Sequence, residues 1–115
     1  MSKPILAVLT PEARQFLQDL EKGARQEFGA SIRKLQNGET LHNFKKLTNT
    51  DGIYEFSVVA PHHTCRLFAF WDARGATATL IVCTHGLDKK TQKTPPQEIK
   101  KAEQLKRKHF ATYSS

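Results

Sequence analysis

A group of lysines follows an apolar segment in the last third of the chain. The segment TATLIVCTH ends at His85, and the next residues, GLDKKTQKTP, carry Lys89, Lys90 and Lys93 against one aspartate. Crowded ammonium groups repel one another, so we expect one of these lysines to lose its proton readily enough to act as a base. The others would stabilise negative charge that develops on a phosphate group. The cluster therefore indicates phosphate chemistry, with solvated surface lysines as the alternative.

Arg66 is the first long charged residue in the apolar segment CRLFAFWD. If the hairpin that follows turns over the ARGA sequence, Arg66 lies opposite Cys83, and His85 lies diagonally adjacent on the same face. A turn shifted by one residue would place His85 on the other face. A guanidinium beside an imidazole suits a phosphate, and the alternative is a structural arginine paired with Glu55.

Other residues complete the set of candidates. Tyr54 carries a hydroxyl that could reach a phosphate or act as an acid. The catalytic candidates are Tyr54, Arg66, His85, Lys90 and Lys93. The RNA-binding candidates are Lys45, Lys46, Lys89, Lys100 and Lys101.

A zinc site is a further alternative, because HHTC (62–65) and CTH (83–85) could lie side by side and offer two cysteines and two histidines. The spacing is not that of a CxxC knuckle, so free thiols in a core are favoured. We expect neither a metal nor another cofactor. The sequence has no serine on a nucleophile elbow, no paired carboxylates at strand ends and no phosphate-binding glycine loop.

The elements that must position these residues follow from periodicity and turn residues. Thr10-Pro11-Glu12 has the pattern of a helix start, and a second helix is expected from about 25 to 36. Segments 52–60, 65–72 and 77–85 have the composition of strands, and a helix with Thr94 as its cap closes the chain. We therefore expect one α+β domain over residues 1–115. It would have an N-terminal helical hairpin, an antiparallel-rich sheet with the helices on one face, and a C-terminal helix.

Charge points to a polyanionic partner. The 115 residues carry a formal net charge of +7 and a pI of about 9.7. The segment 85–110 contains eight Lys and Arg against three acidic residues. Such a balance favours nucleic acid. No apolar run is long enough to span a membrane, and the N-terminus is too polar for a signal peptide, so the cytoplasm is the expected location.

Four segments together resemble the RelE/HigB superfamily of bacterial toxins, and most closely its HigB-like branch with phage-derived members. They are LTPEARQFLQDL, KKLTNTDGIYEFSV, CRLFAFWD and HGLDKKTQKTPPQEIKKAEQLKRK, which cover nearly the whole chain. In this resemblance Arg66 matches the central-strand arginine at the scissile phosphate, and Tyr54 matches an aromatic position before a strand glutamate. The lysine run after the last strand, with His85 beside it, matches the basic group of the family.

The resemblance implies a microbial-RNase-like fold and the toxin of a type II toxin–antitoxin pair. Such a toxin inhibits translation as a metal-independent endoribonuclease that cuts mRNA, usually on the ribosome, by attack of a 2′-hydroxyl on the scissile phosphate. It also implies an antitoxin partner with a helix-turn-helix domain. Two other functions stay open: a ParE-like protein that inhibits DNA gyrase without cutting RNA, and a basic RNA-binding domain without catalysis.

Overall fold

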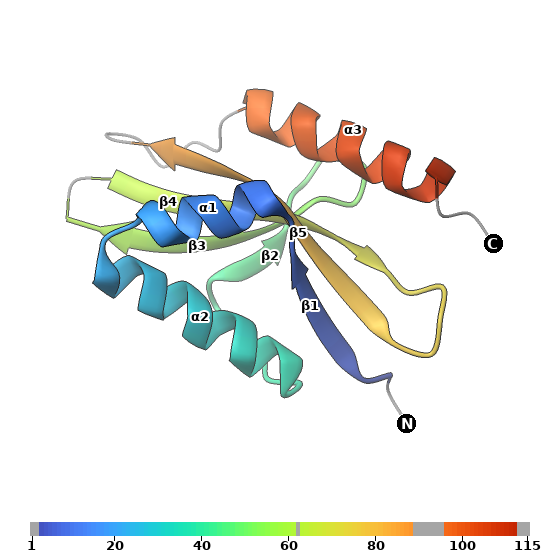
Figure 1. The fold of residues 1–115 in the computed structure, drawn as a ribbon, viewed down its shortest axis with the longest axis horizontal. Helices are drawn as coiled ribbons and strands as arrows, with labels where there is room; N and C mark the ends of the chain where they lie inside the picture. Colours follow the sequence, from blue (N-terminus) through green and yellow to red (C-terminus); the bar gives the residue numbers. More distant parts are fainter. Residues whose placement is uncertain (1–2, 62, 89–95, 113–115) are drawn as a thin grey trace.

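The computed structural model describes residues 3–61, 63–88 and 96–112. These residues form five strands and three helices, whose arrangement is drawn in Figure 1. In chain order they are β1 (Ile5–Leu9), α1 (Pro11–Asp19), α2 (Lys22–Gln36), β2 (Phe44–Lys46), β3 (Tyr54–Ala60), β4 (His63–Asp72), β5 (Ala78–Asp88) and α3 (Pro96–Thr112).

The strands form one mixed sheet in the order β1-β5-β4-β3-β2. The first strand runs parallel to β5, in a register that extends from Ile5 opposite Ala78 to Leu9 opposite Val82. The other three pairings are antiparallel. The strand nearest the N-terminus therefore lies beside the strand nearest the C-terminus.

The predicted N-terminal helical hairpin is wrong as a description of the fold. The chain begins with a strand, the sheet is mixed, and the two helices α1 and α2 lie between β1 and β2 in the sequence. The reason is that residues 5–9, ILAVL, form only a five-residue strand, and its partner lies far along the chain. Local periodicity cannot reveal a pairing of that kind.

Side chains of the sheet alternate between two apolar layers. One layer includes Phe56, Leu67 and Leu80 and packs against Phe28 of α2. The other includes Phe68 and Phe70, with Ala102 of α3 packed against them. Helices α1 and α2 thus cover one face and α3 the other, so the prediction that all helices share a face is wrong (Figure 1).

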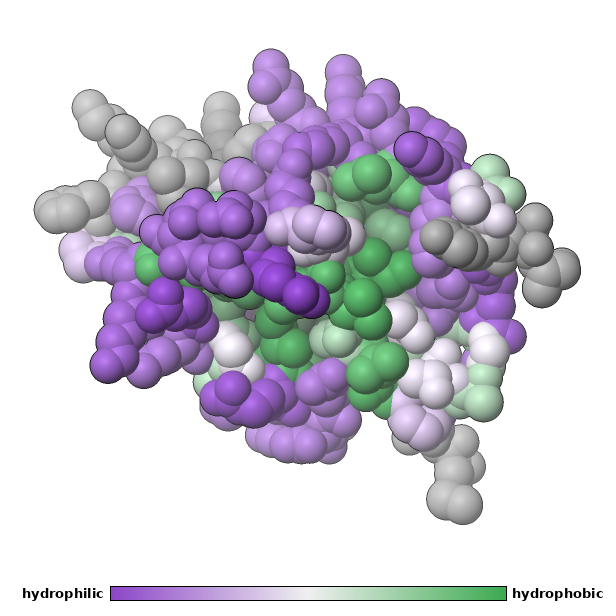
Figure 2. All heavy atoms as spheres, in the orientation of Figure 1, coloured by the Kyte–Doolittle hydropathy of each residue, from purple (hydrophilic) through white to green (hydrophobic). Residues whose placement is uncertain are grey.

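The face drawn in Figure 2 is mostly hydrophilic. Figure 2 shows hydrophilic residues over much of one face, with apolar residues gathered in a band near its middle. Exposed large apolar residues include Leu6 and Val8 of β1 and Val59 of β3. Among the described residues, no helix has the length and apolar character to cross a membrane.

Candidate active site at the end of strand β5

The start of α1 lies against the outer edge of β5. The pairing of β1 with β5 ends at Leu9 and Val82, and the chain turns into α1 at the next residue. The Thr10 backbone N–H donates to Val82 O (2.9 Å) and its hydroxyl donates to Cys83 O (3.0 Å). The same hydroxyl oxygen caps α1 by accepting from Ala13 N–H at 3.3 Å. These bonds place the first turn of α1, with Glu12, beside the second half of β5.

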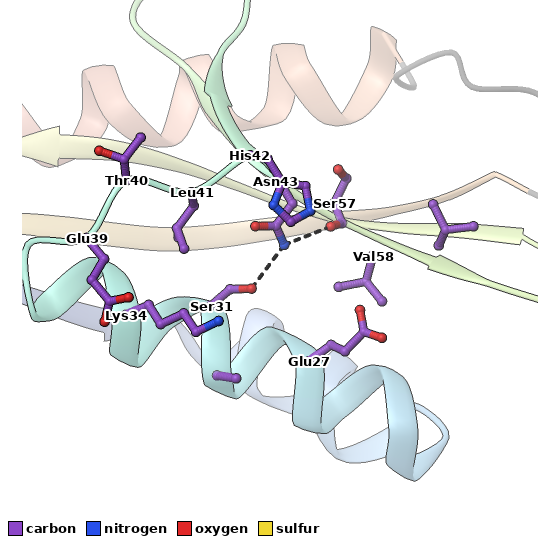
Figure 3. A pocket seen from close by; sticks show the side chains of 12 residues that line it. Glu27, Ser31, Lys34, Glu39, Thr40, Leu41, His42, Asn43, Ser57 and Val58 are labelled. Atoms are coloured by element: carbon purple, nitrogen blue, oxygen red, sulfur yellow. Dashed lines mark hydrogen bonds between the residues drawn. The ribbon is translucent and has the colours of Figure 1, made fainter.

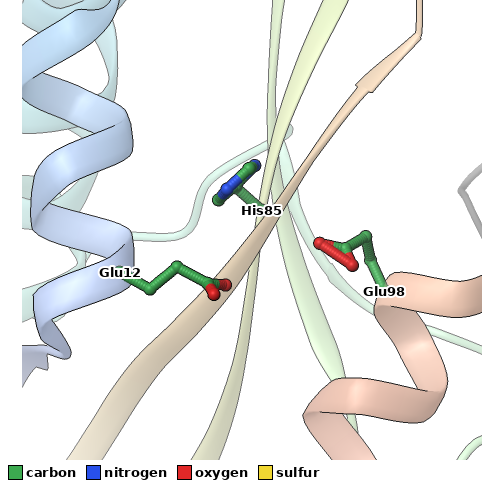
Figure 4. Close-up of side chains that lie close together, drawn as sticks. All are labelled: Glu12, His85 and Glu98. Atoms are coloured by element: carbon green, nitrogen blue, oxygen red, sulfur yellow. The ribbon is translucent and has the colours of Figure 1, made fainter.

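The start of α3 reaches the same place from the other face of the sheet. Glu98, in the first turn of α3, accepts a hydrogen bond from the hydroxyl of Thr84, which is completely buried (3.1 Å). One ligand-type atom from each of Glu12, His85 and Glu98 lies within 4.8 Å of the other two. Figure 4 shows the three side chains converging from α1, β5 and α3. We call Glu12, His85 and Glu98 the His–Glu cluster.

The imidazole of the cluster is held in a defined orientation. His85 lies opposite Leu67 and stacks on Phe16 of α1, with ring centroids 4.3 Å apart and planes within 5° of parallel. Its Nδ1 atom is buried and has no hydrogen-bond partner among the described residues. A stacked ring at a strand end can present a nitrogen to a ligand without losing much freedom on binding.

The carboxylate of Glu12 is ionised and paired. Burial raises its pKa, but the hydrogen bond from Lys101 and the charge of Lys101 outweigh burial, so the pKa lies below its usual value. In return, the ion pair with Glu12 raises the pKa of Lys101. The His–Glu cluster and Lys101 together therefore offer two carboxylates, an imidazole and an ammonium group. Such groups can transfer protons and stabilise charge at a phosphate.

Arg66 lies apart from this cluster. It pairs with Gly86 and not with Cys83, so the predicted register is wrong. Two of the three residues of difference arise at the turn, where Asp72 lies opposite Thr79 and not opposite residue 77. An irregularity between Phe68 and Ala69, across which the pairing moves from Thr84 to Val82, adds the third and exchanges the faces. His85 therefore lies on the face covered by α1 and α2, while Arg66 faces the α3 side.

The ion pair of Arg66 with Glu55, considered from the sequence, is present in the structure. Its Nη1 lies 2.8 Å from Glu55 Oε1, and only 4% of the Arg66 side chain and 1% of the Glu55 side chain are exposed. Glu55 also lies diagonally across from Arg66 on the α3 side of the sheet. The pair therefore joins β3 to β4 inside the protein.

Tyr54 is separated from both Arg66 and His85. It stacks on Phe44 at 5.4 Å between centroids and contacts Trp71 edge to face, on the side covered by α1 and α2. It pairs with Ala69, three residues along β4 from Arg66, which corresponds to roughly 10 Å along a strand. The structure therefore does not bring these three candidates into one site.

The lysine candidates are also spread out. Lys45 and Lys46 are exposed on the edge strand β2, and Lys100 is exposed on α3. Of the RNA-binding candidates that the structure describes, Lys101 contacts the His–Glu cluster, through Glu12. The predicted cluster of Lys89, Lys90 and Lys93 lies outside the described residues.

The predicted free thiols are confirmed. Cys65 and Cys83 are both buried and unpaired, and they belong to the apolar layers on opposite faces of the sheet. Burial raises the pKa of Cys83 to about 12. The two sulfurs therefore cannot share the cysteine–histidine zinc site considered from the sequence, of which His62 lies outside the described residues.

A concave region lies elsewhere, and no residue of the His–Glu cluster lines it. A cavity of about 610 Å³ lies between α2, the segment before β2, and β3 (Figure 3). Asn43 donates to Ser31 Oγ (3.0 Å) and to Ser57 O (3.1 Å) across it. None of the predicted site residues lines this cavity.

Glu12 and Glu98 were not predicted as site residues from the sequence. Each is an acidic residue in the first turn of a helix, which is a common position that needs no function. Only the parallel pairing of β1 with β5 places Glu12 near His85, and no local pattern reveals that pairing. The available indication for the start of α3 was the sequence directly after the lysine run, where Pro95-Pro96 is followed by Glu98.

Comparison with known proteins identifies the family. No curated protein and no solved structure is significantly similar to the chain. The family described as "Phage derived protein Gp49-like (DUF891)" matches residues 15–107, a range that includes His85 and Glu98. Because this match covers most of the chain, the protein belongs to the Gp49-like family of phage-derived proteins, a RelE-like toxin family of toxin–antitoxin systems.

Proposed function

We propose that this protein is an endoribonuclease toxin of the HigB-like type, which cuts mRNA on the translating ribosome and so inhibits translation. The family supports a toxin of a toxin–antitoxin system. The observation that carries the nuclease proposal is the His–Glu cluster, where an imidazole and two carboxylates lie within 4.8 Å of one another beside Lys101.

In the proposed reaction the RNA supplies its own nucleophile. The 2′-hydroxyl oxygen attacks the adjacent phosphorus, the bond to the 5′-oxygen breaks, and the products are a 2′,3′-cyclic phosphate and a 5′-hydroxyl. His85 transfers the proton, either from the attacking hydroxyl or to the leaving oxygen. Glu12 and Glu98 stabilise the imidazolium form. This arrangement needs no metal.

Cationic residues would hold the RNA backbone. The chain carries a net charge of +7, and the lysine run 89–93 directly follows the strand that bears His85. Exposed Lys100 lies two residues after Glu98 on α3. We expect binding to weaken steeply with salt, because phosphate contacts release counterions from RNA.

We propose a positioning role for Arg66. A direct contact with the scissile phosphate would require it to leave its buried ion pair with Glu55. In its observed place, the guanidinium holds β4 against β3, next to the strand that carries His85. Tyr54, stacked on Phe44, lies on β3, two strands away from His85 in the sheet order.

The family implies an antitoxin partner. We propose that this partner has a helix-turn-helix domain and that the toxin acts in the cytoplasm, where mRNA and ribosomes are its targets. Without a bound antitoxin, the cationic surface of the toxin would be open to RNA at all times.

The test is expression of the chain in bacterial cells, with growth and transcript ends followed together. We expect growth arrest and new 5′-hydroxyl ends within mRNA coding regions, both lost in His85→Gln. His42→Gln is the matched control, because His42 is exposed and lies in the segment before β2. Arrest with intact transcripts and DNA-damage signalling would instead identify a gyrase inhibitor, and RNA binding without cleavage or arrest would identify a non-catalytic domain.

A further inference from the structure

Two buried polar atoms of the His–Glu cluster lack a protein partner. Glu12 Oε2 and His85 Nδ1 are both inaccessible to solvent, and neither has a hydrogen-bond partner among the described residues. The other oxygen of Glu12, Oε1, is bound by Lys101. Buried polar atoms in folded proteins are nearly always satisfied, so both atoms are available to bind a further group, and both belong to residues whose ligand atoms lie within 4.8 Å of one another.

The donor set is one that metal ions use. It consists of one imidazole nitrogen and two carboxylate oxygens, which are ligands for zinc and for neighbouring divalent transition metals. The ligands come from three elements, α1, β5 and α3, so the fold and not a flexible loop brings them together (Figure 4). Hydrogen bonds from Lys101 to Glu12 and from Thr84 to Glu98 would orient the two carboxylates.

The spacing is close to what a metal requires. Zinc binds nitrogen and oxygen ligands at roughly 2.0–2.2 Å in a tetrahedron, so two of its ligand atoms lie roughly 3.4 Å apart. The three ligand atoms here lie within 4.8 Å of one another. The glutamate side chains would have to rotate to close the remaining gap of about 1.4 Å.

The local charge also favours a cation. Among residues 3–61, 63–88 and 96–112, two carboxylates and one ammonium group, Lys101, lie beside His85, so this local balance is negative in a chain whose net charge is +7. An uncompensated carboxylate in a partly buried place attracts a positive ion more strongly than one in water.

We propose that Glu12, His85 and Glu98 bind a divalent transition metal ion, with zinc as the representative. The bound ion would tie the starts of α1 and α3 to β5 and occupy a nitrogen of His85. One consequence rests on the proposed function: because His85 carries the proton in that proposal, the bound metal would stop RNA cleavage, and the toxin would be active in its metal-free form. The binding itself does not depend on the proposed function.

The experiment measures zinc and cobalt binding to the untagged, full-length chain without RNA. Zinc is titrated by calorimetry, cobalt by its visible absorption, and the melting temperature is recorded with and without zinc. Glu98→Gln removes one anionic ligand but keeps an oxygen that Thr84 can donate to. Glu103→Gln, on the same helix and bonded to the backbone of Asp51, is the matched control. His85→Gln is the second test variant.

We expect one zinc ion per chain and a higher melting temperature with zinc. Glu98→Gln and His85→Gln should each weaken binding at least about tenfold, while Glu103→Gln should leave it within about twofold of the wild type. Absence of binding to the folded wild-type chain would overturn the proposal. Equal zinc affinity in the wild type and both cluster variants would also overturn it, because the ion would then lie elsewhere. Neither result bears on RNA cleavage, which transcript mapping tests separately.

Discussion

Replacing Arg66 by alanine should remove a large part of the protein's stability. The guanidinium lies 2.8 Å from the Glu55 carboxylate, and the two side chains are 4% and 1% exposed. Removal of one partner leaves a buried charge without compensation, which costs about 3–5 kcal/mol of unfolding free energy. Domains of this size are stable by roughly 5–15 kcal/mol in total. The variant should therefore be partly unfolded at growth temperature, whatever the role of Arg66 in function.

The magnitude converts into a measurable thermal shift. For a chain of this length, each kcal/mol of lost unfolding free energy lowers the melting temperature by about 4 °C. Arg66→Ala should therefore lower the melting temperature by roughly 12–20 °C. Circular dichroism with heating and with urea measures the shift. The double variant Glu55→Leu with Arg66→Met is the control, because it removes both charges and replaces them with apolar volume.

The double variant should recover most of the stability lost in the single one. If Arg66→Ala costs less than about 1 kcal/mol, or the double variant is as unstable as the single one, the account of a buried, compensated pair is wrong. The single and double variants also separate the effect of Arg66 on stability from its effect on toxicity. Loss of toxicity in Arg66→Ala alone would report unfolding, whereas toxicity in the stable double variant decides whether the guanidinium is needed.

Three further predictions concern stability and reactivity. Hydrogen bonds from the Arg74 side chain hold the pKa of Asp72 well below its usual range. The ionised Asp72 therefore stabilises the fold above about pH 4, and this stabilisation is lost as the pH falls further. In Asp72→Asn, the unfolding free energy should depend less on pH on the acid side. Gly52 has a φ of 69°, so Gly52→Ala should lower the unfolding free energy by about 1 kcal/mol or more. Gly23 lies in α2 with open space around it, so Gly23→Ala should raise the unfolding free energy by about 0.5–1 kcal/mol. Urea denaturation measures both changes. Burial raises the pKa of Cys83 to about 12, so the thiol should resist iodoacetamide at pH 8 in the folded chain and react once urea unfolds it.

Elements with strong local patterns could be predicted from the sequence. Thr10 caps α1 as expected, because a hydroxyl before Pro11 satisfies a backbone N–H of the first turn. The three central strands were recognised from their aromatic and β-branched residues, and they appear as β3, β4 and β5. The closing helix α3 begins at Pro96, within the predicted segment.

The site could not be predicted, because it depends on pairings between distant segments. The five-residue strand β1 has its partner in β5, and this pairing places Glu12 beside His85. The irregularity at Phe68 and Ala69 shifts the register of β5 and turns His85 away from the face of Arg66. A shift of one residue exchanges the two faces of a strand. The length of the turn alone therefore could not predict which face His85 occupies.

The most direct test of the account is cleavage of a defined mRNA by the purified chain in a translation reaction, with and without ribosomes. We measure the 5′-hydroxyl ends produced by the wild type, His85→Gln and His42→Gln, after confirming that the three proteins melt at similar temperatures. The account predicts ribosome-dependent cuts by the wild type and His42→Gln and none by His85→Gln. Equal cleavage by the folded His85→Gln variant, or intact mRNA in every reaction, would contradict it.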